Sequence, residues 1–293
     1  MANSSREIRR RIKSVKNIGQ ITKAMELVSA AKMRKSQTTA LASRPYANLT
    51  KELLSGLLFK IQPDRHPLFK KAAENINNKN SNHKNLAILI TSDRGLAGAF
   101  NTNLVNKSIE YISTDKSEEY DFIAIGKKGA DALKRFNQNI IAFFKTFDKQ
   151  VTMNDIGPIS TIAMGEFLNG VYKKVVVVYP DFISTLVQKP SIYQVLPFQY
   201  DTPKAFDEDF LFEPSPEAVL ANLVEKSIEF TIYQCLVEAA ASEHSARMVA
   251  MRNANDAATD LMDELTLTYN QARQAGITKE LSEISAAKLA MEQ

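Results

Sequence analysis

The stretch that decides the fold is residues 217–275, with the sequence EAVLANLVEKSIEFTIYQCLVEAAASEHSARMVAMRNANDAATDLMDELTLTYNQARQA. It contains neither glycine nor proline, so it predicts one uninterrupted helix that begins at Pro216 or Glu217. At 1.5 Å per residue this helix is about 90 Å long, about twice the width of a compact domain of this chain's size. We therefore expect something other than its own domain to surround it.

Small residues recur along this helix and mark a seam for close packing. Gly276 interrupts the pattern, but Ile277, Leu281 and Ile284 restart it, so we expect the helix to continue nearly to Lys288. The average spacing of about 3.6 residues permits close approach of a second helix with only gentle supercoiling. The seam consists of Ala246, Ala250, Ala254, Ala257, Leu261, Leu265, Thr268, Ala272 and Ala275.

The N-terminal segment predicts the partner helix. Pro45 is expected to end it, with a second helical stretch over residues 46–59. Residues 1–36 carry a net charge of +8, which leaves −4 for the rest of a chain whose formal net charge is +4. The sequence thus predicts an antiparallel pair of long helices with one strongly basic member. Its apolar stripe consists of Ile8, Ile12, Val15, Ile18, Ile21, Met25 and Val28.

The basic helix leaves three interpretations open. Its cations could bind nucleic acid through the phosphate backbone, in a sequence-independent and salt-sensitive way. They could instead face an acidic protein surface and steer its approach. A solvated helix face is the third possibility, but the predicted pair has little surface of its own domain to cover it, which favours a partner.

The middle of the chain predicts a small α/β domain over residues 86–195, after a polar exposed loop over residues 75–85. Residues 182–187 could pair with residues 192–196 as an edge hairpin, because Pro190 and Pro197 exclude a central position. An acidic, aromatic loop follows over residues 206–212. The predicted strands are 86–91, 122–125, 140–144, 175–179 and 192–196, and the predicted helices are 103–113, 128–136 and 159–169.

The sequence contains no motif that predicts a catalytic, nucleotide-binding or metal site. Gly95 and Gly98 follow the first strand as they would in a nucleotide-binding turn, but neither a G-x-G-x-x-G nor a P-loop motif is present, so a structural turn is favoured. The three histidines lack metal-ligand spacing, and the acidic residues at 207–209 are better explained as a solvated or docking loop. We expect no catalytic residue, no cofactor and no metal site. The single cysteine, Cys235, is expected to be an ordinary buried thiol.

Five blocks of sequence resemble the gamma subunit of F-type ATP synthases, in the order expected for that family and across the whole chain. They are IRRRIKSVKNI at 8–18, ITKAMELVSAAKM at 21–33, TSDRGLAGAFN at 91–101, ASEHSARM at 241–248 and YNQARQAGITKELSEI at 269–284. The resemblance implies a long antiparallel coiled coil of N- and C-terminal helices plus a small Rossmann-like α/β domain with a mostly parallel sheet.

The resemblance also implies a function. The coiled coil would be the central rotor shaft inside a ring of alpha and beta subunits, and the α/β domain would be the foot that meets the epsilon subunit and the c-ring of the membrane sector. Such a protein is a non-catalytic subunit that couples ion-driven rotation to ATP synthesis or hydrolysis. It would divide into a shaft helix with a following helical segment (1–60), a linker (61–85), the foot (86–212) and the C-terminal shaft helix (213–293). A basic coiled-coil nucleic-acid-binding protein is the alternative.

Family roles transfer to seven positions. Met25 matches the position that faces an acidic loop of the beta subunit, where Lys23 beside it would supply charge. The others match positions that contact the beta subunits or transmit coupling to them. The family usually has a Gly-Ala pair where this chain has Ala287-Lys288. The redox cysteine pair of the chloroplast type is absent, and no presequence precedes the signature, so we expect a bacterial-type protein on the cytoplasmic face of the inner membrane. The remaining five positions are Arg247, Arg273, Gln274, Thr278 and Glu280.

Overall fold

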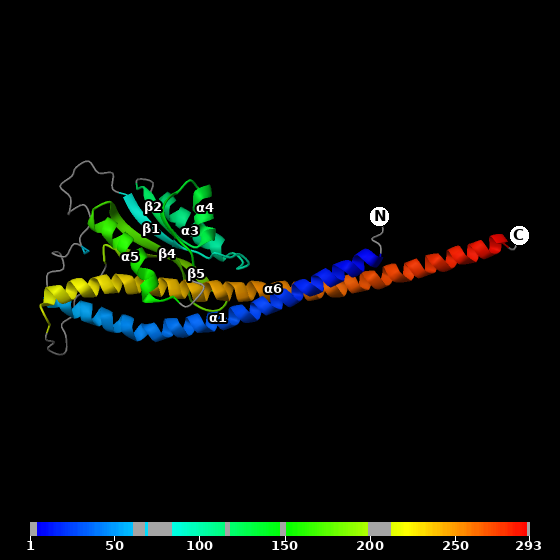
Figure 1. Ribbon diagram of the computed structural model, residues 1–293, viewed down its shortest axis with the longest axis horizontal. Helices are drawn as coiled ribbons and strands as arrows, with labels where there is room; N and C mark the ends of the chain where they lie inside the picture. Colours follow the sequence, from blue (N-terminus) through cyan, green and yellow to red (C-terminus); the bar gives the residue numbers. More distant parts are fainter. Residues whose placement is uncertain are drawn as a thin grey trace. The chain divides into compact units, whose positions relative to one another are not determined.

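Along the chain, one long helix precedes an α/β domain and a second long helix follows it. The computed structural model describes residues 5–60, 68–69, 84–114, 118–146, 151–198 and 212–291. The chain begins with α1 (Ser5–Lys60) and ends with α6 (Pro216–Met291), both shown in Figure 1. Between them lie β1 (Lys84–Ile90), α3 (Phe100–Thr114), β2 (Tyr120–Ile125), α4 (Lys127–Arg135), β3 (Asn139–Phe144), α5 (Met153–Leu168), β4 (Tyr172–Phe182) and β5 (Gln188–Leu196).

The sheet has five strands in the order β3-β2-β1-β4-β5. Strand β1 is parallel to β2 and β4, and β2 is parallel to β3, whereas β5 is antiparallel to β4 at one edge. The central strands are continuous runs of apolar residues because both faces of a parallel sheet are covered. The predicted fold class is therefore confirmed. Each of the five predicted strands overlaps an observed strand, and the first runs one residue past the end of β1.

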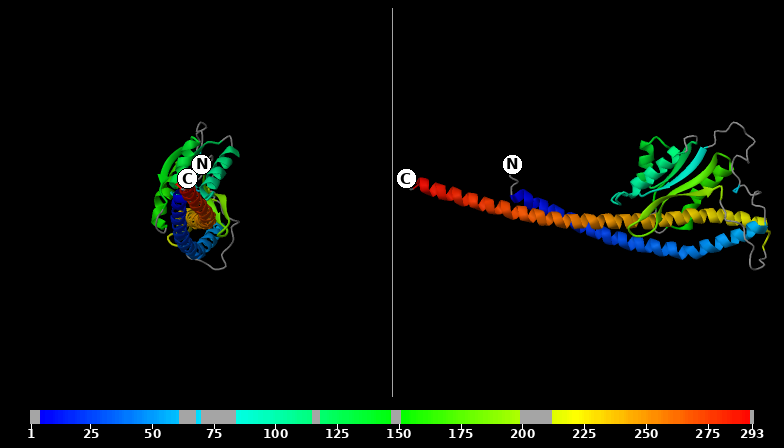
Figure 2. Two further views of the ribbon diagram at one scale, coloured as in Figure 1. Left: turned by 90° about the vertical axis from the view of Figure 1, so that its right-hand side faces the viewer. Right: turned by 180° about the vertical axis from the view of Figure 1, so that it is seen from behind.

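Each face of the sheet has its own apolar core. Helices α3 and α4 cover one face, where Leu104 and Leu133 pack on Ala87 and Leu89. Helix α5, the first part of α6 and the end of α1 cover the other face. Figures 1 and 2 show α5 on the side of the sheet opposite α3 and α4. Cys235 is buried in this second core, as predicted.

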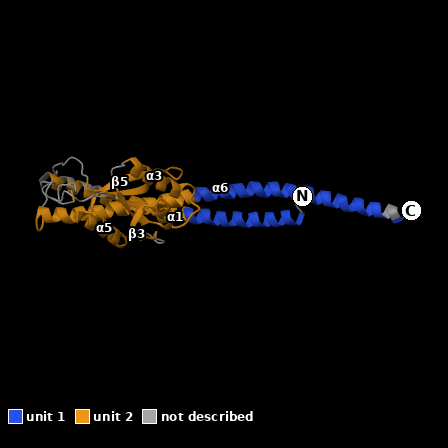
Figure 3. Cartoon of the chain, turned by 90° about the horizontal axis from the view of Figure 1, so that it is seen from above, with its two compact units in different colours: residues 1–29, 248–293 blue, residues 30–247 orange. Residues whose placement is uncertain are grey.

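The chain divides into two compact units, and the boundary between them falls within both long helices (Figure 3). Unit 1 consists of residues 1–29 and 248–293, and unit 2 consists of residues 30–247. Unit 1 contains the antiparallel helix pair, and unit 2 contains the sheet with all of its covering helices. The division by element made from the sequence, 1–60, 61–85, 86–212 and 213–293, stays a prediction.

The predicted helix end at Pro45 is wrong, because α1 continues to Lys60 with Pro45 inside it. Proline costs a helix interior about 3 kcal/mol, so its neighbours must compensate. Ser43 donates a hydrogen bond to Gln234 Oε1 at 2.7 Å, and the ring of Tyr46 lies 4.8 Å from that of Phe230. Contacts to α6 on both sides of Pro45 therefore hold the helix together.

The seam of the helix pair in unit 1 matches the predicted residues only in part. The buried and half-buried positions alternate at spacings of four and three on both helices, the 3.5-residue period of a coiled coil. A Cβ at Gly19 would lie 3.7 Å from Ala258 Cβ, so the backbones approach closely. The positions are Ile8, Ile12, Val15, Gly19, Thr22, Glu26 and Ser29 on α1, and Met251, Asn255, Ala258, Met262, Leu265, Tyr269 and Ala272 on α6.

Small and polar residues occupy several positions of this seam, and several of the residues predicted for it are exposed. On α1, Ile18, Ile21 and Val28 are more than half exposed, while Thr22 and Ser29 are buried. On α6, the exposed members of the predicted seam are Ala257, Leu261, Thr268 and Ala275. Hydrophobicity placed Ile8, Ile12 and Val15 in the seam correctly, but from Gly19 onward close helix packing favours small side chains, so the apolar stripe and the seam diverge.

Three loop predictions had mixed outcomes. The loop predicted at 75–85 lies outside the described residues except for Lys84 and Asn85, which belong to β1. The edge hairpin exists, but it pairs β4 with β5, and residues 183–187 form its turn instead of a strand. Of the loop at 206–212, only Phe212 is described, and it packs against the core.

Helix α6 continues through Gly276 to Met291, which confirms the predicted continuation.

Candidate functional site

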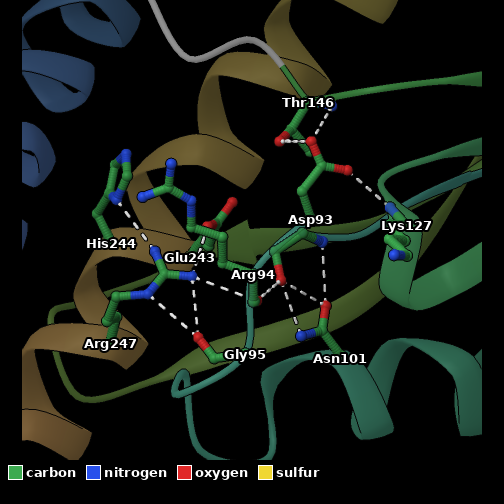
Figure 4. Close-up of polar contacts among 10 residues, drawn as sticks. Asp93, Arg94, Gly95, Asn101, Lys127, Thr146, Glu243, His244 and Arg247 are labelled. Atoms are coloured by element: carbon green, nitrogen blue, oxygen red, sulfur yellow. Dashed lines mark hydrogen bonds and ion pairs between the residues drawn. The ribbon is translucent and has the colours of Figure 1, made fainter.

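The first candidate site is the edge of the sheet at which β1 and β2 end (Figure 4). Asp93 Oδ1 accepts the backbone N–H of Lys127 at 2.8 Å, and its Oδ2 accepts the backbone N–H and the hydroxyl of Thr146 at 2.9 and 2.8 Å. Lys127 is the first residue of α4. The carboxylate of Asp93 therefore occupies the helix N-terminus, the place where a bound phosphate would lie in a nucleotide-binding fold.

Two glycines let α4 approach the end of β1. Gly126 has a φ of +96°, and a Cβ there would lie 2.4 Å from the backbone oxygen of Thr91. At Gly129 a Cβ would lie 2.5 Å from Thr91 Oγ1, which accepts the N–H of Gly129 at 2.9 Å. Both glycines therefore serve the close packing of α4 on the end of β1, because a side chain at either position would clash with Thr91.

The segment 242–247 of α6 lies over the same edge. Ser242 donates its hydroxyl hydrogen to Pro180 O at 3.1 Å, and Ser245 donates to Thr185 O at 2.6 Å. Arg247 forms an ion pair with Glu243 at 2.7 Å and makes longer hydrogen bonds to Gly95 O at 3.4 Å (Figure 4). These contacts reach the end of β4, the turn after it and the turn after β1, so α6 covers the ends of β1 and β4.

Burial changes the proton affinity of two residues beside Arg247. The pKa of His244 falls to about 4 because burial disfavours its charged form, and the cations Arg247 and Lys32 lower it further. Burial raises the pKa of Glu243, although the charge of Arg247 opposes that change. His244 is therefore neutral near pH 7, and its Nδ1 lies 3.5 Å from Arg247 Nη1.

This geometry disfavours the nucleotide-binding interpretation. Ligands of doubly wound folds bind outside the carboxyl ends of the strands, where the strand order reverses. Here that point lies between β1 and β4, where Arg247 and Ser242 reach both strand ends, and Asp93 occupies the N-terminus of α4, which follows β2. The chain's own side chains thus take the positions that a nucleotide would need.

The second candidate site is the exposed surface of unit 1. On α1, Ile18, Ile21, Met25 and Val28 form a second apolar stripe beside the coiled-coil seam, and only Met25 is half-buried. Residues 273–287 of α6 are all exposed. Within them and at Met291, a stripe with the spacing of one helix face is between 50% and 87% exposed: Ile277, Leu281, Ile284 and Met291.

The seven predicted positions are distributed over both sites. Lys23 is exposed and pairs with Glu26 on its own helix at 2.9 Å, and Met25 belongs to the second stripe of α1. Arg247 is buried in unit 2, away from solvent. The other four are exposed on α6, so they are free of the chain's own core: Arg273, Gln274, Thr278 and Glu280.

Sequence reasoning did not assign roles to Ser242, Ser245 or Glu243. A serine within a helix has no periodic signal, and the only sign was the recurrence of small residues in ASEHSA at 241–246. Among the described residues, no group of three potential metal-ligating side chains comes together. None of the described helices combines the length and the apolar content that a membrane span requires.

Comparisons with known proteins give a consistent result. The sequence profile of the family described as ATP synthase matches residues 4–291. The chain is 42% identical over 293 residues to the ATP synthase gamma chain of Roseiflexus sp. (strain RS-1), with 98% of each chain covered. It is 43% identical over 304 residues to the ATP synthase gamma chain of Herpetosiphon aurantiacus, with 99% of each covered.

Solved structures share the fold. One chain of the Euglena gracilis mitochondrial ATP synthase, in a structure of OSCP, F1 and the c-ring, matches with a TM-score of 0.67 at 22% identity, covering 98% of this chain and 94% of that chain. A chain from the rotor of the same enzyme matches with a TM-score of 0.60 at 21% identity, covering 93% and 98%. The fold of long helices with a mostly parallel sheet is thus the fold of these chains.

Proposed function

Because this chain belongs to the family of ATP synthase gamma chains, we propose that its two long helices work as the central rotor shaft of an F-type ATP synthase. A gamma chain is a non-catalytic subunit of that enzyme. Its rotation presents different surfaces to the catalytic subunits and shifts their affinities for nucleotide in turn. The site geometry fits this role, since the crevice of the α/β domain is filled by its own side chains.

The observation that carries the proposal is the pair of apolar stripes on unit 1. The described residues leave Ile18, Ile21 and Val28 of α1 exposed, together with the stripe from Ile277 to Met291 on α6. Each large apolar side chain that a partner covers is stabilised by about 1.5–3 kcal/mol relative to remaining in water. A surrounding ring of subunits supplies such cover around a shaft, whereas a solvated helix pair does not.

Cations flank the stripe of α1. Residues 1–29 contain Arg6, Arg9, Arg10, Arg11 and several lysines, all of which are exposed where they are described. Apolar residues between exposed cations favour a protein surface that is itself apolar and acidic, because such a surface satisfies both. A nucleic-acid duplex would use only the cations, and the relatives named above are ATP synthase chains, so they give that alternative no support.

The finer assignments follow from the family. We propose that Lys23, Met25, Arg273, Gln274, Thr278 and Glu280 contact the beta subunits, and that Arg247 transmits coupling from inside unit 2. The α/β domain meets the epsilon subunit and the c-ring. The protein works at the cytoplasmic face of a bacterial inner membrane and associates with it through the complex.

Truncation tests the shaft. Deleting residues 276–293 removes the exposed α6 stripe but leaves the seam to Ala272, so the complex should still assemble and ATP-driven rotation should weaken. A longer deletion that reaches Leu261 should abolish coupled ATP synthesis. The measurements are ATP-driven rotation by complexes reconstituted with alpha and beta subunits, and ion-driven ATP synthesis by the whole enzyme that contains the membrane sector. Unchanged coupling after the longer deletion would contradict the proposal.

A salt titration with unrelated DNA duplexes tests the alternative. A basic nucleic-acid binder would bind them at low salt and lose affinity steeply as salt rises. We expect no binding that survives physiological salt, and co-purification with alpha and beta chains instead. Tight duplex binding at physiological salt without those chains would favour the alternative.

A further inference from the structure

Most of the contact between α6 and the sheet is apolar. The buried side chains on this part of α6 include Val224, Ile228 and Ile232, which pack into the core on the face of the sheet that α5 shares. Apolar burial is strong but has no preferred direction. It fixes which face of α6 meets the sheet, whereas hydrogen bonds, which depend on angle, also restrain smaller rotations about the helix axis.

Directional contacts occur at the end of this interface. The hydroxyls of Ser242 and Ser245 donate to the backbone oxygens of Pro180 and Thr185 at 3.1 and 2.6 Å. Both serines are fully buried. Without Ser242 the buried carbonyl of Pro180 loses this partner in a dry environment, which is costly, whereas the Thr185 oxygen keeps a 3.0 Å hydrogen bond from Gln188 Nε2. A backbone oxygen cannot follow a sliding helix as a long side chain can.

Arg247 adds a third contact, which reaches the turn after β1. Its guanidinium bonds to Gly95 O at 3.4 Å and to Arg94 O at 3.5 Å, and it forms the 2.7 Å ion pair with Glu243 on its own helix. Glu243 therefore orients the guanidinium toward the turn after β1. The planar group suits this task because it serves the carboxylate and the carbonyls at once.

The position of these three residues along α6 is informative. Arg247 is the last residue of unit 2, and Met248 begins the α6 part of unit 1. The helix itself continues from Pro216 to Met291. The directional contacts thus lie at the point where α6 leaves the unit that contains the sheet.

We infer that Ser242, Ser245 and Arg247 form a torque joint, which fixes the rotation of α6 on the α/β domain. Arg247 is a positioning residue in this joint, since it acts by holding the turn at residues 94–95 against α6. The inference rests on the proposed rotor function, because a joint of this kind matters only if torque passes between the sheet and the helix. The apolar core provides adhesion and the joint provides angular stiffness.

Angular fluctuations in the assembled enzyme test the joint. Complexes containing R247Q or the double variant S242A/S245A are immobilised through the catalytic subunits, and a probe on the exposed surface of α4 reports the angle. We expect the variance of the angle during pauses to increase at least twofold in both variants. The matched control is K226Q, which removes an exposed cation and its 2.7 Å ion pair with Glu229 from the same helix, and its variance should equal that of the wild type.

A loss of stability alone would reduce the number of complexes without changing the variance in those that rotate. Amide hydrogen exchange of residues 95–98 in the full chain gives a second measurement, with faster exchange expected in R247Q and not in K226Q. Equal variance in R247Q, S242A/S245A and K226Q would overturn the joint while leaving the rotor function intact. If the wild-type chain does not assemble with alpha and beta subunits, the proposed function itself fails, and the joint with it.

Discussion

The two halves of α6 share one backbone but differ in their surroundings. Residues 216–247 belong to unit 2, where Ile228 and Ile232 are fully buried and two serines bond to β4 and to the turn after it. Residues 248–291 belong to unit 1, where the seam is narrow and Leu281 and Ile284 are mostly exposed. One half therefore stabilises the fold, and the other presents a surface that the chain itself leaves uncovered.

The largest expected effect contrasts two substitutions on this one helix. Ile228→Ala removes a fully buried side chain from the core and should lower the free energy of unfolding by about 3 kcal/mol. Leu281→Ala, at an exposed position, should change it by no more than about 0.5 kcal/mol. Urea denaturation of both variants checks the contrast. Similar losses at the two positions would mean that the chain buries the end of α6 in solution.

Gly126 gives a slightly smaller effect in unit 2. Gly126→Ala places a methyl group 2.4 Å from the backbone of Thr91 at a φ of +96°, so it should destabilise the fold by about 2 kcal/mol. Gly157→Ala, within α5, is the matched control because a Cβ there meets nothing within 4 Å. Thermal unfolding of the two variants is the measurement. Equal melting temperatures would contradict the close packing of α4 on β1.

The pH dependence of stability tests His244. Its pKa of about 4 lies below the ordinary value of 6.5, so the unfolded chain binds an additional proton between those values. The free energy of unfolding should therefore decrease as pH falls from about 6.5 to about 4, by an amount of the order of 1 kcal/mol, and level off below that.

His244→Gln should remove this part of the slope when urea denaturation is repeated at several pH values. Glu243 acts in the opposite sense because its pKa is raised, so the difference between the wild type and the variant is the informative quantity. Identical slopes for the two proteins would show that His244 is not buried beside Arg247.

The smallest expected effect is a gain in helix stability in the exposed half of α6. Gly276→Ala meets nothing within 4 Å and replaces the poorest ordinary helix former with the best, so the isolated chain should gain about 0.5–1 kcal/mol of helix stability. Circular dichroism during heating measures the gain. If the catalytic ring surrounds this residue closely, the same methyl group should slow rotation in the complex, and an unaffected rate would show that the ring leaves room there.

Local patterns predicted the elements well because their causes are local. The Val175–Val178 run, for example, forms the buried middle of β4, and the absence of glycine and proline from residues 217–275 predicted an uninterrupted α6. Pro45 was misjudged because the contacts that keep α1 helical come from Phe230 and Gln234, which are far away in the sequence.

The faces of the helices were harder to predict than their existence. Hydrophobicity placed Ile18 and Ile21 in the seam, yet Gly19 and Thr22 occupy it, because close packing depends on size. The same reason hid the joint: Ser242 and Ser245 differ little from alanine in a helical pattern, and their hydrogen-bond acceptors are backbone atoms of another element. The family resemblance, in contrast, depended on whole blocks of sequence and was confirmed.

The buried thiol of Cys235 has a practical consequence for labelling. It is the only cysteine in the chain, it is enclosed in the core, and burial raises its pKa, so it remains protonated and unreactive near neutral pH. A maleimide dye would therefore find no native target in the folded protein. Any one surface residue replaced by cysteine becomes a unique attachment point, without the need to remove the natural one.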